Sequence, residues 1–125
     1  AQDFQKGLEA AQSGDFETAL KELTPLAEGG NYVAQYYLGV SYHKGLGVLQ
    51  DYKTAVKWFT LSAEQGDANA QNNLGAMYGN GFGVPKNVTY AHMWFNIKNK
   101  DSEKVIMHLL DMRQPSATAS SARRQ

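Results

Sequence analysis

Cysteine is absent from this chain of 125 residues, and neither sign of charge is in excess. Without cysteine the chain can form no disulfide, no thiolate nucleophile and no cysteine-ligated zinc or iron–sulfur site. Twelve Lys and Arg balance twelve Asp and Glu, so the formal net charge is zero. This balance argues against a nucleic-acid partner, which needs a dominant basic surface. The sequence also lacks any run of about 18 apolar residues, so we expect no membrane insertion.

Motifs for metal binding and catalysis are missing as well. The three histidines, His43, His92 and His108, show neither His-x3-His nor His-Glu-x2-His spacing, so no metal site and no cofactor is expected. No Gly-x-Ser-x-Gly elbow or P-loop occurs, and the Asp and Glu residues are scattered rather than paired. We therefore expect a protein without enzymatic activity.

What the sequence does contain is an internal repeat with a period of 36 residues. The residues that recur unchanged one period later, between Ala70 and Phe95, are Ala34, Gln35, Leu38, Gly39, Tyr42, Gly45, Gly47, Val48, Ala55, Trp58 and Phe59. One period earlier, a weaker match covers Ala19, Ala27, Glu28 and Gly30, so a degenerate first unit precedes two full ones. A repeat of this length indicates a stacked architecture in which neighbouring units share a core.

Each unit reads as two antiparallel helices, because its apolar residues recur at helical spacing. Asn31 and Asp67 precede the first helices and Asp51 and Asn87 the second, and all four are good N-cap types. Glycine-rich loops over 44–50 and 80–86 separate the paired helices.

Small and large residues alternate in a way that suggests how the helices pack. We expect the small Gly39 and Gly75 to let paired helices approach. The aromatic pairs Trp58-Phe59 and Trp94-Phe95 are expected to fill the space between successive units.

The pattern Ala-Gln-x2-Leu-Gly-x2-Tyr, followed by a Gly-x-Gly-Val loop and Asp-Tyr-x2-Ala-x2-Trp-Phe, resembles the Sel-one-like repeat (SLR), a relative of the tetratricopeptide repeat (TPR). The resemblance runs from Asn31 to Phe95, whereas Gly7 and Gly14-Asp15-Phe16 look like a tetratricopeptide unit. It implies an all-α fold, a right-handed α/α superhelical solenoid of antiparallel helix pairs.

The expected domain organisation is a single repeat domain over residues 1–125. Its parts are a TPR-like unit (1–30), two SLR units (31–66 and 67–100), a capping helix (101–113) and a weakly ordered tail (114–125).

The related tetratricopeptide geometry implies that the first helix of each unit lines a concave face. Counted from Gly7, Gly39 and Gly75, the residues expected on that face are Phe4, Leu8, Ala11, Tyr36, Val40, His43, Asn72, Ala76 and Gly79, with Lys44 and Asn80 at the rim. Tyr36 would supply an aromatic anchor, and His43 or Asn72 would bond a peptide backbone. In the alternative interpretation, Tyr36 and Val40 pack on the neighbouring unit or on the N-terminal arm.

The resemblance implies an adaptor or scaffold that binds a protein or peptide, in bacterial envelope signalling, secretion or toxin neutralisation. A few cysteine-rich members of the family are credited with β-lactam hydrolysis, but this chain lacks their cysteines, so a hydrolase is the weaker alternative. The other alternative is a structural protein that self-associates through Ile106 and Leu109 near its C-terminal end, although we expect a monomer.

The expected location is periplasmic or secreted, with a cytoplasmic location as the alternative. The chain opens Ala1-Gln2-Asp3 without an initiator Met, which fits a mature N-terminus left by a signal peptidase or a trimmed chain.

Overall fold

The computed structural model describes residues 3–97, and within this range it contains helices and no strand. In chain order the helices are α1 (Phe4–Ser13), α2 (Phe16–Glu28), α3 (Tyr32–Lys44), α4 (Tyr52–Glu64), α5 (Ala68–Asn80) and α6 (Val88–Phe95). All six belong to one compact unit, Ala1–Phe95. The expected capping helix over 101–113 and the tail over 114–125 lie outside the described residues.

The four predicted N-caps are confirmed. At each of them a side-chain oxygen accepts a backbone N–H from the first turn of the helix, which satisfies a donor that the helix itself leaves free. The pairs are Asn31 with Ala34 at 3.0 Å, Asp51 with Thr54 at 3.3 Å, Asp67 with Ala70 at 3.1 Å and Asn87 with Tyr90 at 2.9 Å. The helix boundaries are therefore set by local side chains.

The glycine-rich loops lie on the start of the second helix of the preceding unit. Gly47, with φ of +77°, lies so close to α2 that a Cβ atom there would be 2.9 Å from Leu20 Cδ1 and 3.0 Å from Phe16 Cβ. Gly83 has φ of +76° and lies equally close to the backbone of Tyr52, the first residue of α4. Both the left-handed backbone and the lack of space require glycine at these two positions.

The prediction that glycine lets paired helices approach is confirmed. A Cβ atom on Gly39 would lie 2.5 Å from Phe59 Cδ1, and one on Gly75 would lie 2.6 Å from Phe95 Cε1. In the second and third units, an aromatic ring of the second helix therefore rests directly on the backbone of the first helix.

The prediction that both members of each Trp-Phe pair lie between successive units is wrong for Phe59. Its ring is fully buried, but it lies between α3 and α4 of the same unit, because Gly39 leaves space for it there. Trp58 is half-buried and packs against the core residues shared by the first two units. Trp94 is buried at 2% exposure, whereas Phe95 stays 47% exposed.

Successive units are joined by the same buried hydrogen bond at both junctions. Gln35 Nε2 donates to Ala27 O, and the equivalent Gln71 Nε2 donates to Ala63 O, each at 3.1 Å. Gln65 Nε2 also donates to Gln35 Oε1 at 2.8 Å. These bonds satisfy polar groups that would be costly to bury unpaired.

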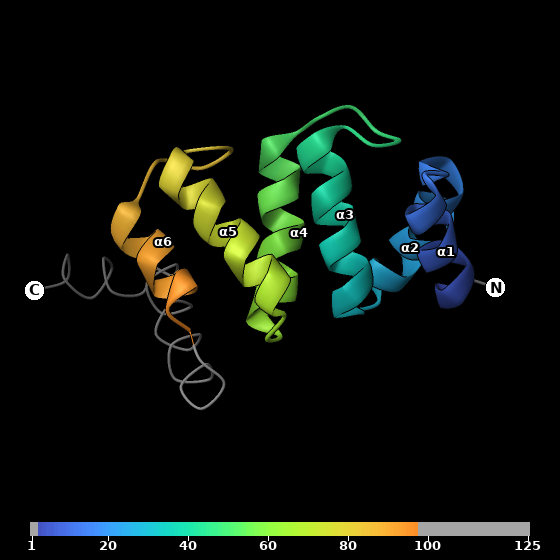
Figure 1. Cartoon of the computed structure of the whole chain (residues 1–125), viewed down its shortest axis with the longest axis horizontal. Coiled ribbons are helices and arrows are strands. Elements are labelled where there is room, and N and C mark those ends of the chain that lie inside the picture. The colour runs from blue at the N-terminus through green and yellow to red at the C-terminus, as the bar shows by residue number, and fades with distance from the viewer. Residues whose placement is uncertain (1–2, 98–125) are drawn as a thin grey trace, which may run out of the picture. The chain divides into compact units, whose positions relative to one another are not determined.

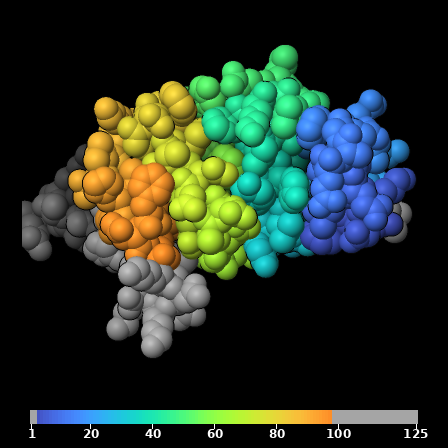
Figure 2. Space-filling model, in the orientation of Figure 1, coloured from blue at the N-terminus to red at the C-terminus, as the bar shows by residue number. Residues whose placement is uncertain are grey.

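The helices follow one another in a row, and each packs mainly on its neighbours in the chain (Figure 1). The space-filling view shows the first unit in blue, the second in teal to green and the third in yellow to orange, in contact in that order (Figure 2). The result is a stack of antiparallel helix pairs in which α1, α3 and α5 are the first helices of the three pairs.

Candidate interaction face and an inter-repeat cavity

The predicted interaction face lies on α1, α3 and α5, and its exposure changes along the stack. Phe4 and Leu8 on α1 are half-buried, and Phe4 packs against the core. On α3, the side chains of Tyr36, Val40 and His43 are also half-buried. The predicted positions on α5, namely Asn72, Ala76 and Asn80, are exposed. The third unit therefore offers the most accessible part of this face.

Tyr36 and His43 lie on the same side of α3 and both contact the buried ring of Phe59. The ring centroid of Tyr36 is 6.1 Å from that of Phe59, and the centroid of His43 is 6.4 Å from it. Tyr36 also meets Tyr37 edge to face at 5.6 Å. Both ring contacts of Tyr36 thus lie within its own unit, and the side chains of Tyr36 and His43 are held in place by aromatic contacts.

His43 has an environment that favours its neutral form. Burial lowers the pKa of His43 below its usual 6.5, and the charge of the adjacent Lys44 lowers it further. The ring of Tyr52 lies 5.5 Å from the imidazole. At neutral pH the ring can therefore both donate and accept a hydrogen bond, as the bonding of a peptide backbone requires.

The polar side chains of α5 differ in how far their hydrogen bonds are already used. Asn80 Nδ2 donates to Ala76 O at 2.9 Å, so one of its donors is taken by its own helix. Asn72 is exposed, and within residues 3–97 its amide makes no hydrogen bond. Asn72 is therefore the predicted residue with the most free hydrogen-bonding capacity.

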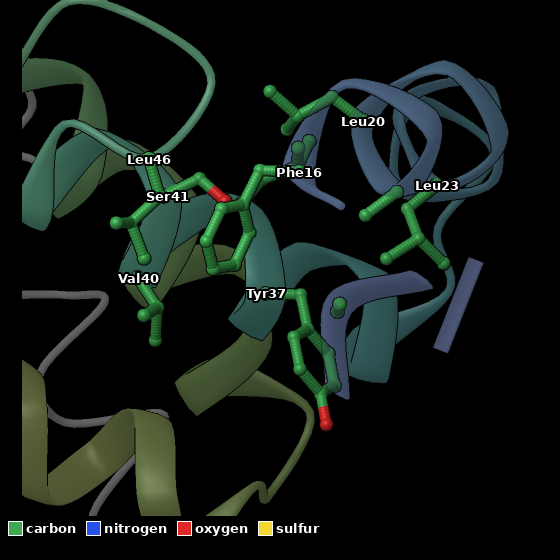
Figure 3. Close-up of a pocket in the computed structure, with 10 residues that line it drawn as sticks. Phe16, Leu20, Leu23, Tyr37, Val40, Ser41 and Leu46 are labelled. Atoms are coloured by element: carbon green, nitrogen blue, oxygen red, sulfur yellow. The ribbon is translucent and has the colours of Figure 1, made fainter. Parts of the chain in front are cut away.

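A cavity of about 160 Å³ lies where α1 and α2 meet α3 (Figure 3). Phe16, Leu20 and Leu23 reach it from α2, and Tyr37, Leu38, Val40 and Ser41 from α3. Ala11, Ala19 and Leu46 complete the lining. The cavity is partly enclosed and mostly apolar.

Sequence reasoning placed only Val40 and Ala11 of these lining residues at a site. The other lining residues were missed because they come from α2, from the loop after α3, or from positions of α3 outside the predicted face, namely Tyr37, Leu38 and Ser41. A signal was present in the repeat: Ser41 and Leu46 stand where the next unit has the larger Met77 and Phe82. Smaller residues at equivalent positions leave space if the backbones superpose.

Ser41 and Lys44 stand at the Ser-x2-Lys spacing found in β-lactamases. In this chain the spacing falls in the last turn of α3, where Ser41 is buried beside the cavity and Lys44 is exposed. No hydrogen bond joins Ser41 Oγ to Lys44 Nζ in the described part of the chain. The spacing therefore does not place a base beside the hydroxyl, as an activated serine requires.

Residues 3–97 contain neither a candidate metal site nor a membrane-spanning helix. In this range no three His, Asp or Glu side chains come together as a metal site would require. None of the helices there is both long and apolar enough to cross a membrane.

The stacked helix pairs, their repeated junctions and their accessible face define a helical repeat solenoid of the all-α class. The model of the Sel1 repeat matches this chain twice, at residues 33–67 and 68–97. These two matches cover more than half of the sequence, so the chain belongs to the Sel1 repeat family, as the resemblance to the Sel-one-like repeat predicted.

Two solved structures support the same assignment. A Sel1 repeat protein from Oxalobacter formigenes is 37% identical, with a TM-score of 0.70 over 74% of this chain and 38% of its own. The second is c5321, a protective antigen present in uropathogenic Escherichia coli strains that displays an SLR fold. It is 26% identical, with a TM-score of 0.67 over 88% of this chain and 26% of its own. The present chain therefore spans well under half the length of either relative.

No match was found among the curated proteins. Sel1 repeats are generally protein-interaction modules, and proteins of the family are typically non-enzymatic scaffolds. This class of function agrees with a stack of helix pairs that presents a face built from several helices.

Proposed function

We propose that this chain is an adaptor or scaffold module that binds a protein or peptide segment across the face formed by α1, α3 and α5. The observation that carries the proposal is the combination of fixed ring side chains on α3 with exposed positions on α5. Tyr36 and His43 are fixed by their contacts with Phe59, and the neighbouring α5 presents exposed positions with an unused amide at Asn72.

These groups suit recognition by contact area rather than by charge. A ring that is already held in place loses little side-chain entropy when a partner packs on it. Asn72 can donate to and accept from an extended backbone, and neutral His43 can do the same one helix away. Affinity would then come from buried area and a few hydrogen bonds.

The biological setting is part of the same proposal: a bacterial protein of the periplasm or the exterior, acting in envelope signalling, secretion or toxin neutralisation. Both solved relatives come from bacteria, and one of them is a protective antigen. These relatives support the proposed setting. The roles of the full-length relatives are not assigned to this chain, because it covers only part of each. Fractionation of the source cells tests the location, and a purely cytoplasmic signal would contradict it.

The experiment compares two charge-adding double variants in the same repeat. Asn72→Arg with Ala76→Arg alters exposed positions of α5 on the proposed face. Thr89→Arg with His92→Arg alters exposed positions of α6 and serves as the matched control. Neither double variant replaces a buried residue, so both should keep the circular dichroism spectrum and the melting temperature of the wild type.

Partners are first captured from the source organism, and the strongest one is then purified for titration. We expect wild type and the α6 control to bind it alike, and the α5 variant to bind at least about tenfold more weakly. Equal affinities for all three proteins would contradict the proposed face.

A further inference from the structure

The cavity lies at the first junction of the repeat, and at the second junction larger residues stand at two of the equivalent positions. At the junction of the second and third units, Met77 and Phe82 stand one period after Ser41 and Leu46. Met77 is 1% exposed, and the ring of Phe82 stacks on Tyr52 with centroids 4.9 Å apart and planes inclined by 11°. At the first junction, the smaller Ser41 and Leu46 leave that space open.

Other equivalent positions differ in both directions. Leu23, which lines the cavity, corresponds to Phe59, whose ring lies between α3 and α4 of its own unit, and the lining residue Tyr37 corresponds to Asn73. Ala11 lies four residues after Gly7, as His43 lies four residues after Gly39, and the His43 ring packs on Tyr52 at 5.5 Å. At the position of Leu46 the first junction therefore lacks the ring that Phe82 supplies at the second.

The size and chemistry of the cavity fit an aromatic ring. Its volume of about 160 Å³ is close to that of an engineered apolar cavity of roughly 150 Å³ that binds benzene. The lining is mostly carbon, with Phe16, Leu20 and Val40 as large apolar walls. Water gains few hydrogen bonds in such a space, so an apolar group gains most by entering it.

Charge around the cavity indicates what flanks that ring. The first unit, over residues 3–30, carries six acidic residues and only two lysines. Asp15, which caps α2, and Glu17 are exposed on either side of the lining residue Phe16, while the exposed Lys21 follows Leu20 and the exposed Lys44 ends α3. A bound segment with Lys or Arg beside its ring would meet opposite charge there.

We propose that the cavity between the first and second units binds one Phe or Tyr side chain of a partner segment, with a basic residue next to it. This site lies beside the face formed by α1, α3 and α5, and its biological use rests on the proposed function. Its capacity to hold a ring does not depend on that function, and the two can be tested separately.

The first test uses p-cresol, the side-chain analogue of tyrosine, as the probe. Methyl resonances of the labelled protein are followed by nuclear magnetic resonance as p-cresol is added. The filled variant is Ser41→Met with Leu46→Phe, which copies the residues of the second junction. The control is Leu49→Phe, which adds a ring to the same loop at a position that is 91% exposed.

We expect saturable shifts at Leu20, Val40 and Leu46 in the wild type and the same affinity in the Leu49→Phe control. In the filled variant the affinity should fall at least about tenfold. If the double variant does not fold, Leu46→Phe alone serves in its place. It puts a ring at the position equivalent to Phe82, which stacks on Tyr52 at the second junction. Shifts that do not saturate, or a filled variant that binds as well as wild type, would overturn the proposal.

The second test compares two capped tripeptides, Lys-Phe-Lys and Glu-Phe-Glu, on the wild-type protein. We expect the basic peptide to bind several-fold more tightly at low salt and to lose that advantage as salt is raised. Equal affinities would remove the basic flank from the proposal. If the cavity binds its probes but the α5 variant binds the partner as well as wild type does, only the proposed face is contradicted. If the α5 variant binds the partner more weakly but the cavity binds no probe, only the cavity proposal is contradicted.

Discussion

His43 illustrates how a single side chain can serve both packing and recognition. Its ring contacts Tyr52 and Phe59, so part of its surface is removed from water, and its exposed part lies on the proposed face. Loss of solvation disfavours the charged form of a histidine, and the neighbouring Lys44 adds repulsion. The imidazole is therefore held neutral by the same contacts that fix its orientation.

This environment predicts a pH dependence of stability with a definite sign. The pKa of His43 is lowered in the folded chain, so below 6.5 the unfolded chain takes up a proton more readily than the folded one. The stability that neutral His43 contributes is fully present above pH 6.5. It is lost as the pH falls from 6.5 toward the pKa of His43 in the folded chain. Below that pKa the contribution no longer changes with pH. Proton resonances of the His43 ring should titrate below 6.5.

A His43→Gln variant provides the control for that effect. Melting temperatures of both proteins are compared between pH 8 and pH 5, so that contributions of the other groups cancel in the difference. Wild type should lose more stability on acidification than the variant. A larger loss in the variant would show that His43 gains, rather than loses, affinity for its proton on folding.

At the scale of helices, the contact between the paired helices α3 and α4 depends on a missing side chain. Phe59 occupies the space that a Cβ atom on Gly39 would need, and Phe95 does the same at Gly75. The spacing of the pair is thus set by a ring against a helix backbone. Gly79 on α5 differs, because a Cβ atom there would lie 3.6 Å from Ala91 Cβ, which is ordinary contact.

Replacement by alanine should therefore affect stability differently at Gly39 and at Gly79. Gly39→Ala forces the buried ring of Phe59 to move and should lower the free energy of unfolding by about 1–3 kcal/mol. Gly79→Ala meets no obstacle and should be neutral or stabilising by up to about 1 kcal/mol, because alanine favours the helix. Urea unfolding measures both, and an equal cost for the two variants would contradict this packing.

At the scale of the whole stack, stability is expected to vary along the chain. Helices α3 and α4 each pack on a helix on either side, whereas α1 packs mainly on α2. In such an arrangement, neighbouring units stabilise one another and a unit at the end has fewer supports.

Amide hydrogen exchange under native conditions measures that variation directly. The slowest-exchanging amides should fall in α3 and α4, and those of α1 should exchange markedly faster. The Phe4–Ser13 helix would still be anchored by Glu22, which accepts from Asp3 N at 2.8 Å. Protection in α1 equal to that in α3 would indicate that the described helices unfold as one cooperative unit.

The period of the repeat, the helix pairs and their four N-caps could be predicted from the sequence, because each depends on residues close together in the chain. Asn31, for example, caps a helix by bonding an N–H only three residues away. The loop glycines were recognisable for a similar reason, since their spacing recurs with the repeat. The predicted face followed from the resemblance to the tetratricopeptide repeat, whose geometry, counted from Gly39, implies Tyr36, Val40 and His43 on that face.

Tertiary structure alone decided where Phe59 packs and where the cavity lies. Periodicity shows that an aromatic residue faces inward, but not which helix backbone leaves room for its ring. The cavity depends on Phe16, Ser41 and Leu46 meeting from three different segments, and its size is the difference between their volumes and the space that those segments enclose. Such a difference is fixed only when the segments are packed together, since each residue taken alone is an ordinary apolar or small residue of its helix or loop.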